Sequence, residues 1–182
     1  MSRNYKIQNK EGIYFITFAS VEWVDVFTRK IYRDIFIESV RHCQKEKGLV
    51  VYSWCLMSNH VHMIVRSERG DLSGTIRDLK KFTSKKILVE IQENNQESRK
   101  DWMLSIFRNA GEANSNNQTY QFWRQDNRPI ELFSNDVIDQ KLDYVHHNPV
   151  DSGLVEKAED YLYSSARDYA GVKGLIAVDF LD

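Results

Sequence analysis

Residues 54–65 of the chain read Trp-Cys-Leu-Met-Ser-Asn-His-Val-His-Met-Ile-Val. Apolar and β-branched residues on both sides of the Met-Ser-Asn segment predict two strands, about 49–56 and 60–66, joined by a tight connection into an antiparallel hairpin. Successive side chains of a strand point to opposite faces, so His60 and His62 are expected to project from the same face. Two adjacent imidazoles provide half of a divalent-metal site, although a hydrogen-bonded structural pair is the simpler explanation of an isolated His-x-His motif.

Further strands and helices are predicted on both sides of this hairpin. They are a strand at about 14–18, an amphipathic helix at about 29–47 that Gly48 stops, a helix at about 72–91 capped by Asp71, an extended segment at 121–130, a helix from Ser134 to about His147 that ends near Pro149, and a last helix at about 158–170. Their order predicts an α+β protein, in which helices pack against a ferredoxin-like antiparallel sheet. The central strands are apolar on both faces apart from the histidines, so both faces of the sheet are expected to be covered.

The 182 residues are expected to form a single domain, 1–182. A polar stretch, 92–121, predicts a long mobile insertion, in which Trp102 and Phe107 belong to a small docking segment. The remainder, 150–182, is expected to be a C-terminal helical extension.

The composition, with 42% apolar and 28% charged residues, is ordinary for a soluble globular protein. No apolar run approaches the ~18 residues of a membrane span, which predicts a cytoplasmic protein. Cys43 and Cys55 are expected to be small buried residues rather than part of a disulfide framework. The net charge of −1 argues against non-specific coating of nucleic acid. However, a basic middle, residues 66–100, and an acidic C-terminal third allow a local phosphate-binding surface.

Residues 143–150, Asp-Tyr-Val-His-His-Asn-Pro-Val, are the expected partner of the histidine pair. Tyr144 and Asn148 are four residues apart and would share one helix face. A tyrosine hydroxyl can attack phosphorus and form a phosphotyrosine, but its ordinary pKa of about 10 means that it needs assistance. A divalent ion held by two imidazoles and an amide oxygen could assist by polarising the phosphate. This donor set suits Zn²⁺ more obviously than Mg²⁺ or Mn²⁺, but phosphate oxygens and water would complete an oxygen-rich shell.

Each residue of this segment has a second interpretation. Tyr144 could be a packing residue, and Asn148 could simply end the helix, because it precedes a proline. His146 or His147 could replace Asn148 as the third ligand. His147 could instead accompany Asp143.

Residues 57–65 resemble the HUH motif (U, a hydrophobic residue) of the single-tyrosine transposases of insertion-sequence type. Residues 143–150 resemble the tyrosine helix of the REP-associated branch of that family. Residues 80–86 and 163–169 are similar to further stretches in the branch, so that the resemblance runs in order from about 14 to 171.

The resemblance implies an HUH-type ferredoxin-like fold and a metal-dependent transposase that cleaves and rejoins single-stranded DNA at hairpin-bearing sites. Tyr144 would be the nucleophile that forms a 5′-phosphotyrosine link, and His60, His62 and Asn148 would bind Mg²⁺ or Mn²⁺. Asn148 holds the place that a glutamine has in many relatives. The implied partner is single-stranded DNA with a repetitive extragenic palindrome or insertion-end hairpin, and the protein would be a monomer or a homodimer. The polar stretch 92–121 is long for the family.

Basic residues on the helix at 72–91 form a stripe opposite its expected buried residues Ile76, Leu79 and Phe82. Such a stripe is usually a solvated face, but in a DNA-cleaving enzyme it becomes a candidate phosphate-contacting surface. Arg124, beside Trp123, could combine a phosphate contact with base stacking. The predicted DNA contacts are therefore Arg77, Lys80, Lys81, Lys85 and Arg124.

Two other functions remain open at this stage. One is a catalytically inactive module of the same fold that binds a DNA or RNA hairpin. The other is a metal-dependent phosphoesterase that uses water and leaves Tyr144 uninvolved.

Overall fold

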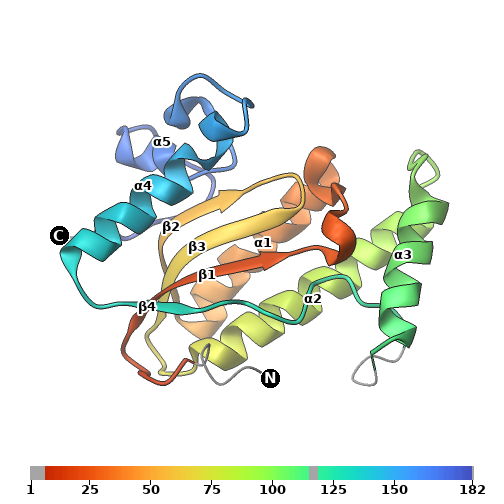
Figure 1. Ribbon diagram of the computed structural model, residues 1–182, viewed down its shortest axis with the longest axis horizontal. Coiled ribbons are helices and arrows are strands. Elements are labelled where there is room, and N and C mark those ends of the chain that lie inside the picture. The colour runs from red at the N-terminus through yellow and green to blue at the C-terminus, as the bar shows by residue number, and fades with distance from the viewer. Residues whose placement is uncertain (1–6, 115–118, 182) are drawn as a thin grey trace.

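The computed structural model describes residues 7–114 and 119–181, and it contains a four-stranded antiparallel sheet with helices on both faces (Figure 1). The strands are β1 (Ile13–Ala19), β2 (Leu49–Leu56), β3 (His60–Ser67) and β4 (Ile130–Leu132). The helices are α1 (Lys30–Lys47), α2 (Leu72–Glu93), α3 (Lys100–Glu112), α4 (Asn135–Asp151) and α5 (Ala166–Tyr169), with 3-10 turns η1 (Val21–Trp23), η2 (Val26–Thr28) and η3 (Ala158–Asp160). The strand order is β2-β3-β1-β4 and every neighbouring pair is antiparallel. The ferredoxin-like prediction is therefore confirmed.

Local signals in the sequence explain where several elements begin and end. Gly48 ends α1 in the left-handed conformation, with φ of 66°, which a glycine adopts without a steric penalty. Asp71 caps α2, because its Oδ1 accepts a hydrogen bond of 2.9 Å from the backbone N–H of Gly74. The hairpin of β2 and β3 has its turn at the predicted place.

Strand alternation divides the apolar residues into two cores. On one face, Phe18 and Met63 pack with α1, α2 and α3. On the other face, Phe15 and Ile64 pack with Val145 of α4. Both faces of the sheet are covered, as predicted, and β3 turns its histidines toward the face that α4 covers. Both cysteines are buried and unpaired, which also agrees with the prediction.

The long loop expected over 92–121 is interrupted by a helix, because residues 100–112 form α3. Met103, Phe107 and Gly111 recur every four residues and are the buried face of this helix. The lack of a side chain at Gly111 allows the backbone at Thr119 to lie directly against α3, because a Cβ there would lie 2.5 Å from the backbone oxygen of Thr119. Part of the expected loop, 115–118, lies outside the described residues.

Three other expectations need correction. Helix α4 continues through Pro149 to Asp151, since a proline in the last turn removes only one intrahelical hydrogen bond. The last helix expected at 158–170 is only η3 and the short α5, so most of the C-terminal extension is irregular. Phe82 was expected on the buried face of α2, but it is 47% exposed. None of the described helices is long and apolar enough to span a membrane.

Candidate active site

His60 and His62 lie side by side on the α4 face of the sheet, with their ring centroids 4.7 Å apart. The ring of Tyr144 packs edge-on against His62, with a centroid distance of 5.1 Å. Tyr144 is 45% exposed, so its side chain is accessible from solvent. Residues of a strand and of a helix that are far apart in the sequence therefore meet here, and the helix is the one that contains the expected partner segment, 143–150.

Asn59 fixes the orientation of the His60 ring and also its tautomer. The Nδ2 of Asn59 donates hydrogen bonds to the backbone oxygen of Trp23 and to Oδ1 of Asp25, each at 3.1 Å. Its Oδ1 therefore faces Nδ1 of His60, at 2.7 Å, and can only accept. Nδ1 of His60 must carry the proton, which leaves the lone pair on Nε2.

His62 is held on the opposite side of its ring. Its Nδ1 lies 2.8 Å from Oγ1 of Thr17 on β1, and its Nε2 lies 3.4 Å from Nδ2 of Asn148. Burial, together with the positive charges of protonated His60 and Lys141, lowers the pKa of His62 to about 3. Burial also lowers the pKa of His60. Both rings are therefore neutral imidazoles at neutral pH.

Helix α4 supplies both Tyr144 and Asn148. The Oγ of Ser134 caps its first turn by accepting a hydrogen bond from the N–H of Val137. Val145 is buried against the sheet, which turns the neighbouring Tyr144 to the edge of the site. Because the helix continues through Pro149, Asn148 keeps helical spacing and lies one turn beyond Tyr144 on the same face.

The two other histidines of α4 point elsewhere. His146 is buried, and its Nε2 lies 3.1 Å from Oγ of Ser53 and 2.9 Å from Oγ of Ser165. His147 is exposed, and its Nδ1 lies 3.1 Å from the backbone oxygen of Asp143. Of the three candidate third ligands, the geometry brings only Asn148 to the histidine pair.

The donor atoms around the pair fit a divalent ion. Each histidine has its Nδ1 engaged by a neighbouring polar group, which is the usual arrangement for an imidazole that binds metal through Nε2. The described residues contain no group of three or more His, Cys, Asp and Glu side chains suited to a metal. The nearby amide of Asn148 adds an oxygen donor if its side chain rotates to present Oδ1 to the pair.

Lys141 and Trp23 border the site, and the sequence motifs did not single them out. Nζ of Lys141 lies 5.6 Å from the ring centroid of Tyr144, and helical spacing could have indicated it, since it precedes Tyr144 by three residues. Trp23 is 50% exposed and packs edge-on against His60, with a centroid distance of 5.8 Å. Its position depends on a turn that has no periodic signature in the sequence.

The structure separates the five predicted DNA contacts. Lys80 is largely buried, and its Nζ donates hydrogen bonds to the backbone oxygen of Arg124 and to Oδ1 of Asn127, at 2.7 and 2.6 Å. Burial lowers the pKa of Lys80 to about 8. Lys81 and Lys85 line a cavity of about 280 Å³ between α1 and α2, on the face of the sheet opposite to the histidines.

The two predicted arginines also lie apart. Arg77 is exposed on α2 and pairs with Asp78 at 3.4 Å. The guanidinium of Arg124 lies 5.4 Å from the ring centroid of Trp23. Among the five predicted contacts, Arg124 is the one joined to the histidine pair through a ring contact, by way of Trp23.

Comparison with known proteins places this chain in a family. A family model described as "Transposase IS200 like" matches residues 10–119, more than half of the chain, and the chain therefore belongs to the IS200-like transposases. The match includes His60 and His62 and ends before Tyr144. No curated protein matches the sequence.

Two solved structures are similar to this chain. One is a REP-associated tyrosine transposase bound to a REP hairpin, with 19% identity, a TM-score of 0.62, and coverage of 100% of this chain and 94% of the other. Another is a candidate transposase from Deinococcus radiodurans R1, with 14% identity, a TM-score of 0.46, and coverage of 80% and 94%. At its low identity, the first likeness confirms the fold.

Proposed function

We propose that this IS200-like transposase cleaves and rejoins single-stranded DNA at hairpin-bearing sites through a 5′-phosphotyrosine on Tyr144. The observation that carries the proposal is the position of α4. This one helix presents a hydroxyl and an amide, at Tyr144 and Asn148, to two neutral imidazoles on β3.

In the proposed cleavage step, the hydroxyl of Tyr144 loses its proton to solvent and its oxygen bonds the scissile phosphorus. The bond from phosphorus to the 3′ oxygen breaks, and that oxygen takes up a proton to leave as a 3′-hydroxyl. Rejoining is the reverse step, in which a 3′-hydroxyl attacks the phosphotyrosine. Lys141 is placed to contact an oxygen of the phosphate held at Tyr144.

His60, His62 and Asn148 are the proposed ligands of a divalent ion, through two Nε2 atoms and one Oδ1. Mg²⁺ or Mn²⁺ bound there would polarise the scissile phosphate and offset its charge. Asn59 and Thr17 keep the rings in place for this role.

Hairpin-bearing single-stranded DNA is the proposed partner, by analogy with the solved transposase bound to a REP hairpin. Arg124 is the proposed phosphate contact beside the site. Arg77, Lys81 and Lys85 are proposed to contact more distant backbone phosphates. Lys80 would support DNA binding indirectly, by holding the segment that contains Arg124 and Asn127, because its ammonium already donates hydrogen bonds to these two residues. All proposed catalytic groups come from one chain, which supports a site that a monomer can use.

Adduct formation tests this proposal. The protein is incubated with Mn²⁺ and an end-labelled DNA hairpin carrying single-stranded flanks, and covalent complexes are separated under denaturing conditions. The wild type and the control Tyr120→Phe should form an adduct, whereas Tyr144→Phe should not. Likewise, His60→Ala should lose the adduct and His42→Ala, at an exposed histidine, should keep it.

Other outcomes would contradict the proposal. An adduct that survives Tyr144→Phe would remove that residue from the mechanism. Cleavage without an adduct would favour a water-using phosphoesterase. Binding without cleavage would favour an inactive hairpin-binding module.

A further inference from the structure

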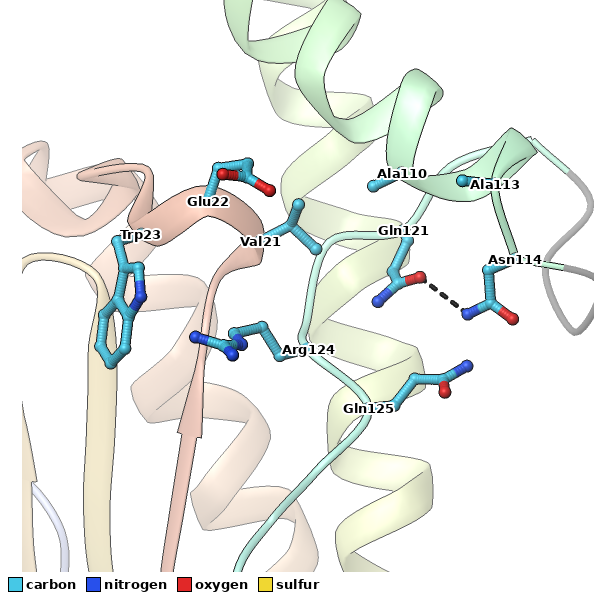
Figure 2. Close-up of a pocket in the computed structure, with 9 residues that line it drawn as sticks. All are labelled: Val21, Glu22, Trp23, Ala110, Ala113, Asn114, Gln121, Arg124 and Gln125. Atoms are coloured by element: carbon cyan, nitrogen blue, oxygen red, sulfur yellow. Dashed lines mark hydrogen bonds between the residues drawn. The ribbon is translucent and has the colours of Figure 1, made fainter. Parts of the chain in front are cut away.

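A groove of about 660 Å³ lies between η1 and α3 (Figure 2). One wall is formed by η1 with Trp23, and the opposite wall by Ala110 of α3 and by Ala113, which directly follows this helix. Arg124 and Gln125 lie along the extended segment between them. The volume lies within the range of pockets that hold small ligands, about 300–1,000 Å³.

Trp23 is presented outward by an unusual backbone. Glu22 and Trp23 both have positive φ, of 51° and 55°, which is sterically unfavourable for residues with a Cβ. The surrounding hydrogen bonds hold the turn in place, since the backbone oxygen of Trp23 accepts from Asn59 and the Oγ of Ser20 donates to the backbone oxygen of Val24 at 2.8 Å. Strain that is maintained by its surroundings is common at binding sites. Here it leaves half of a large aromatic side chain in solvent.

Trp23 links the groove to the candidate active site, because it lines the groove and its ring packs against His60. The same Asn59 side chain that orients His60 also holds the backbone of Trp23. The guanidinium of Arg124 extends toward Trp23 from the groove side (Figure 2). The ammonium of Lys80 donates a hydrogen bond to the backbone oxygen of Arg124. An aromatic ring beside a cation, next to a phosphate-cleaving site, is suited to an unpaired nucleotide, because the ring stacks on the base and the cation contacts the backbone.

We propose that this groove binds unpaired DNA adjoining the scissile phosphate, with a base stacked on Trp23 and a phosphate contacted by Arg124. The inference rests on the proposed function, which requires single-stranded DNA at the histidine pair. Glu22 also lines the groove, and its carboxylate repels phosphates. The backbone is therefore expected to follow the Arg124 side, with the bases toward Trp23.

Binding to two DNA probes in EDTA tests this proposal without any cleavage. One probe is a blunt hairpin, and the other is the same hairpin with a short thymidine overhang, prepared with the overhang at either end. Trp23→Ala should weaken binding of an overhang probe by about tenfold, the effect of losing one stacked base, and leave the blunt hairpin within about twofold. Trp23→Phe should be intermediate, and Arg124→Gln should also affect the overhang probe more. The matched control is Trp102→Ala, because Trp102 is similarly exposed, at 47%, and does not line the groove.

The outcomes separate this proposal from the proposed function. Equal binding of the overhang probes by wild type, Trp23→Ala and Trp102→Ala would overturn the groove assignment, even if the Tyr144 adduct forms. Equal weakening of the blunt and overhang probes by Trp23→Ala would overturn it too, because it would mean a general effect on the fold. Absence of binding to any probe by the wild type would contradict the proposed function itself.

Discussion

The amide of Asn148 lies 3.4 Å from Nε2 of His62 and connects helix α4 to strand β3 across 86 positions of sequence. The contact depends on α4 continuing through Pro149, because only a helical Asn148 lies one turn beyond Tyr144. It also makes the candidate site complete within one chain.

Mixing two inactive variants tests whether the tyrosine serves its own chain. Tyr144→Phe and His62→Ala should each fail to form a DNA adduct, and an equimolar mixture should fail as well, because each chain would lack one part of its site. The measurement is adduct formation on a denaturing gel, with wild type mixed with His62→Ala as the positive control. Recovery of activity in the mixture of the two variants would show that α4 reaches a partner's site.

Asn59→Ala should weaken metal-dependent activity without removing any proposed ligand. His60 would lose the acceptor that fixes its Nδ1 proton, and losing such a supporting group costs about 10–100-fold in metal affinity or activity. The measurement is the Mn²⁺ concentration that gives half-maximal cleavage, with exposed Asn95→Ala as the control. An unchanged Mn²⁺ requirement in Asn59→Ala would contradict the orienting role of Asn59.

Stability should fall as the pH drops below the ordinary histidine pKa. Burial lowers the pKa of His146 from 6.5 to about 4, so the unfolded chain takes up a proton before the folded chain does. The contribution of this residue is therefore complete above about pH 6.5 and is lost as the pH falls toward 4. The expected slope is about 1.4 kcal/mol per pH unit.

Urea unfolding in EDTA over this pH range measures the effect. The His146→Asn variant should show a smaller slope of unfolding free energy against pH than the wild type. His62, whose pKa is also lowered by burial, contributes to the slope that remains. The matched control is His147→Asn, which removes an exposed imidazole from the same helix. Identical slopes for wild type and His146→Asn would contradict the buried, neutral assignment.

Lys80 and Lys81 should respond differently to replacement by alanine, although they are neighbours. Lys81→Ala should leave stability unchanged and, if Lys81 contacts a phosphate, reduce the slope of log affinity against log salt by about 1. Lys80→Ala should lower the thermal unfolding temperature, because it leaves the Arg124 backbone oxygen and Asn127 without their donor. Titration of hairpin DNA at several salt concentrations, together with thermal melts, measures both. The structural role of Lys80 would be contradicted if Lys80→Ala kept its thermal unfolding temperature and reduced the slope of log affinity against log salt.

Local patterns in the sequence were sufficient to predict most of the strands and helices that carry the candidate site. The alternation in β3 predicted the shared face of His60 and His62, and Gly48 and Asp71 marked helix ends that the structure confirms. The four-residue spacing of Tyr144 and Asn148 predicted that they share one helix face. The proline after Asn148 had left open whether the helix extends that far. These predictions are confirmed because each depends on interactions within one strand or one helix.

Features that depend on tertiary contacts were not predicted. Helix α3 was missed because the surrounding sequence is polar and its apolar face is short. The four-residue spacing of Met103 and Phe107 could nevertheless have indicated a helix. Lys80 was grouped with a solvated stripe, whereas a distant segment buries it. Trp23 reaches the site through a left-handed turn held by Asn59, and no local propensity specifies that conformation.

We propose that α4 brings Tyr144 to the histidine pair as the nucleophile that becomes linked to DNA. The most direct measurement is mass spectrometry of the covalent complex after digestion with nuclease and protease. We expect a nucleotide remnant on the peptide containing Tyr144, attached through a 5′ phosphate, in samples given Mn²⁺ and hairpin DNA. A remnant on any other residue, or DNA cleavage with no modified peptide, would contradict it.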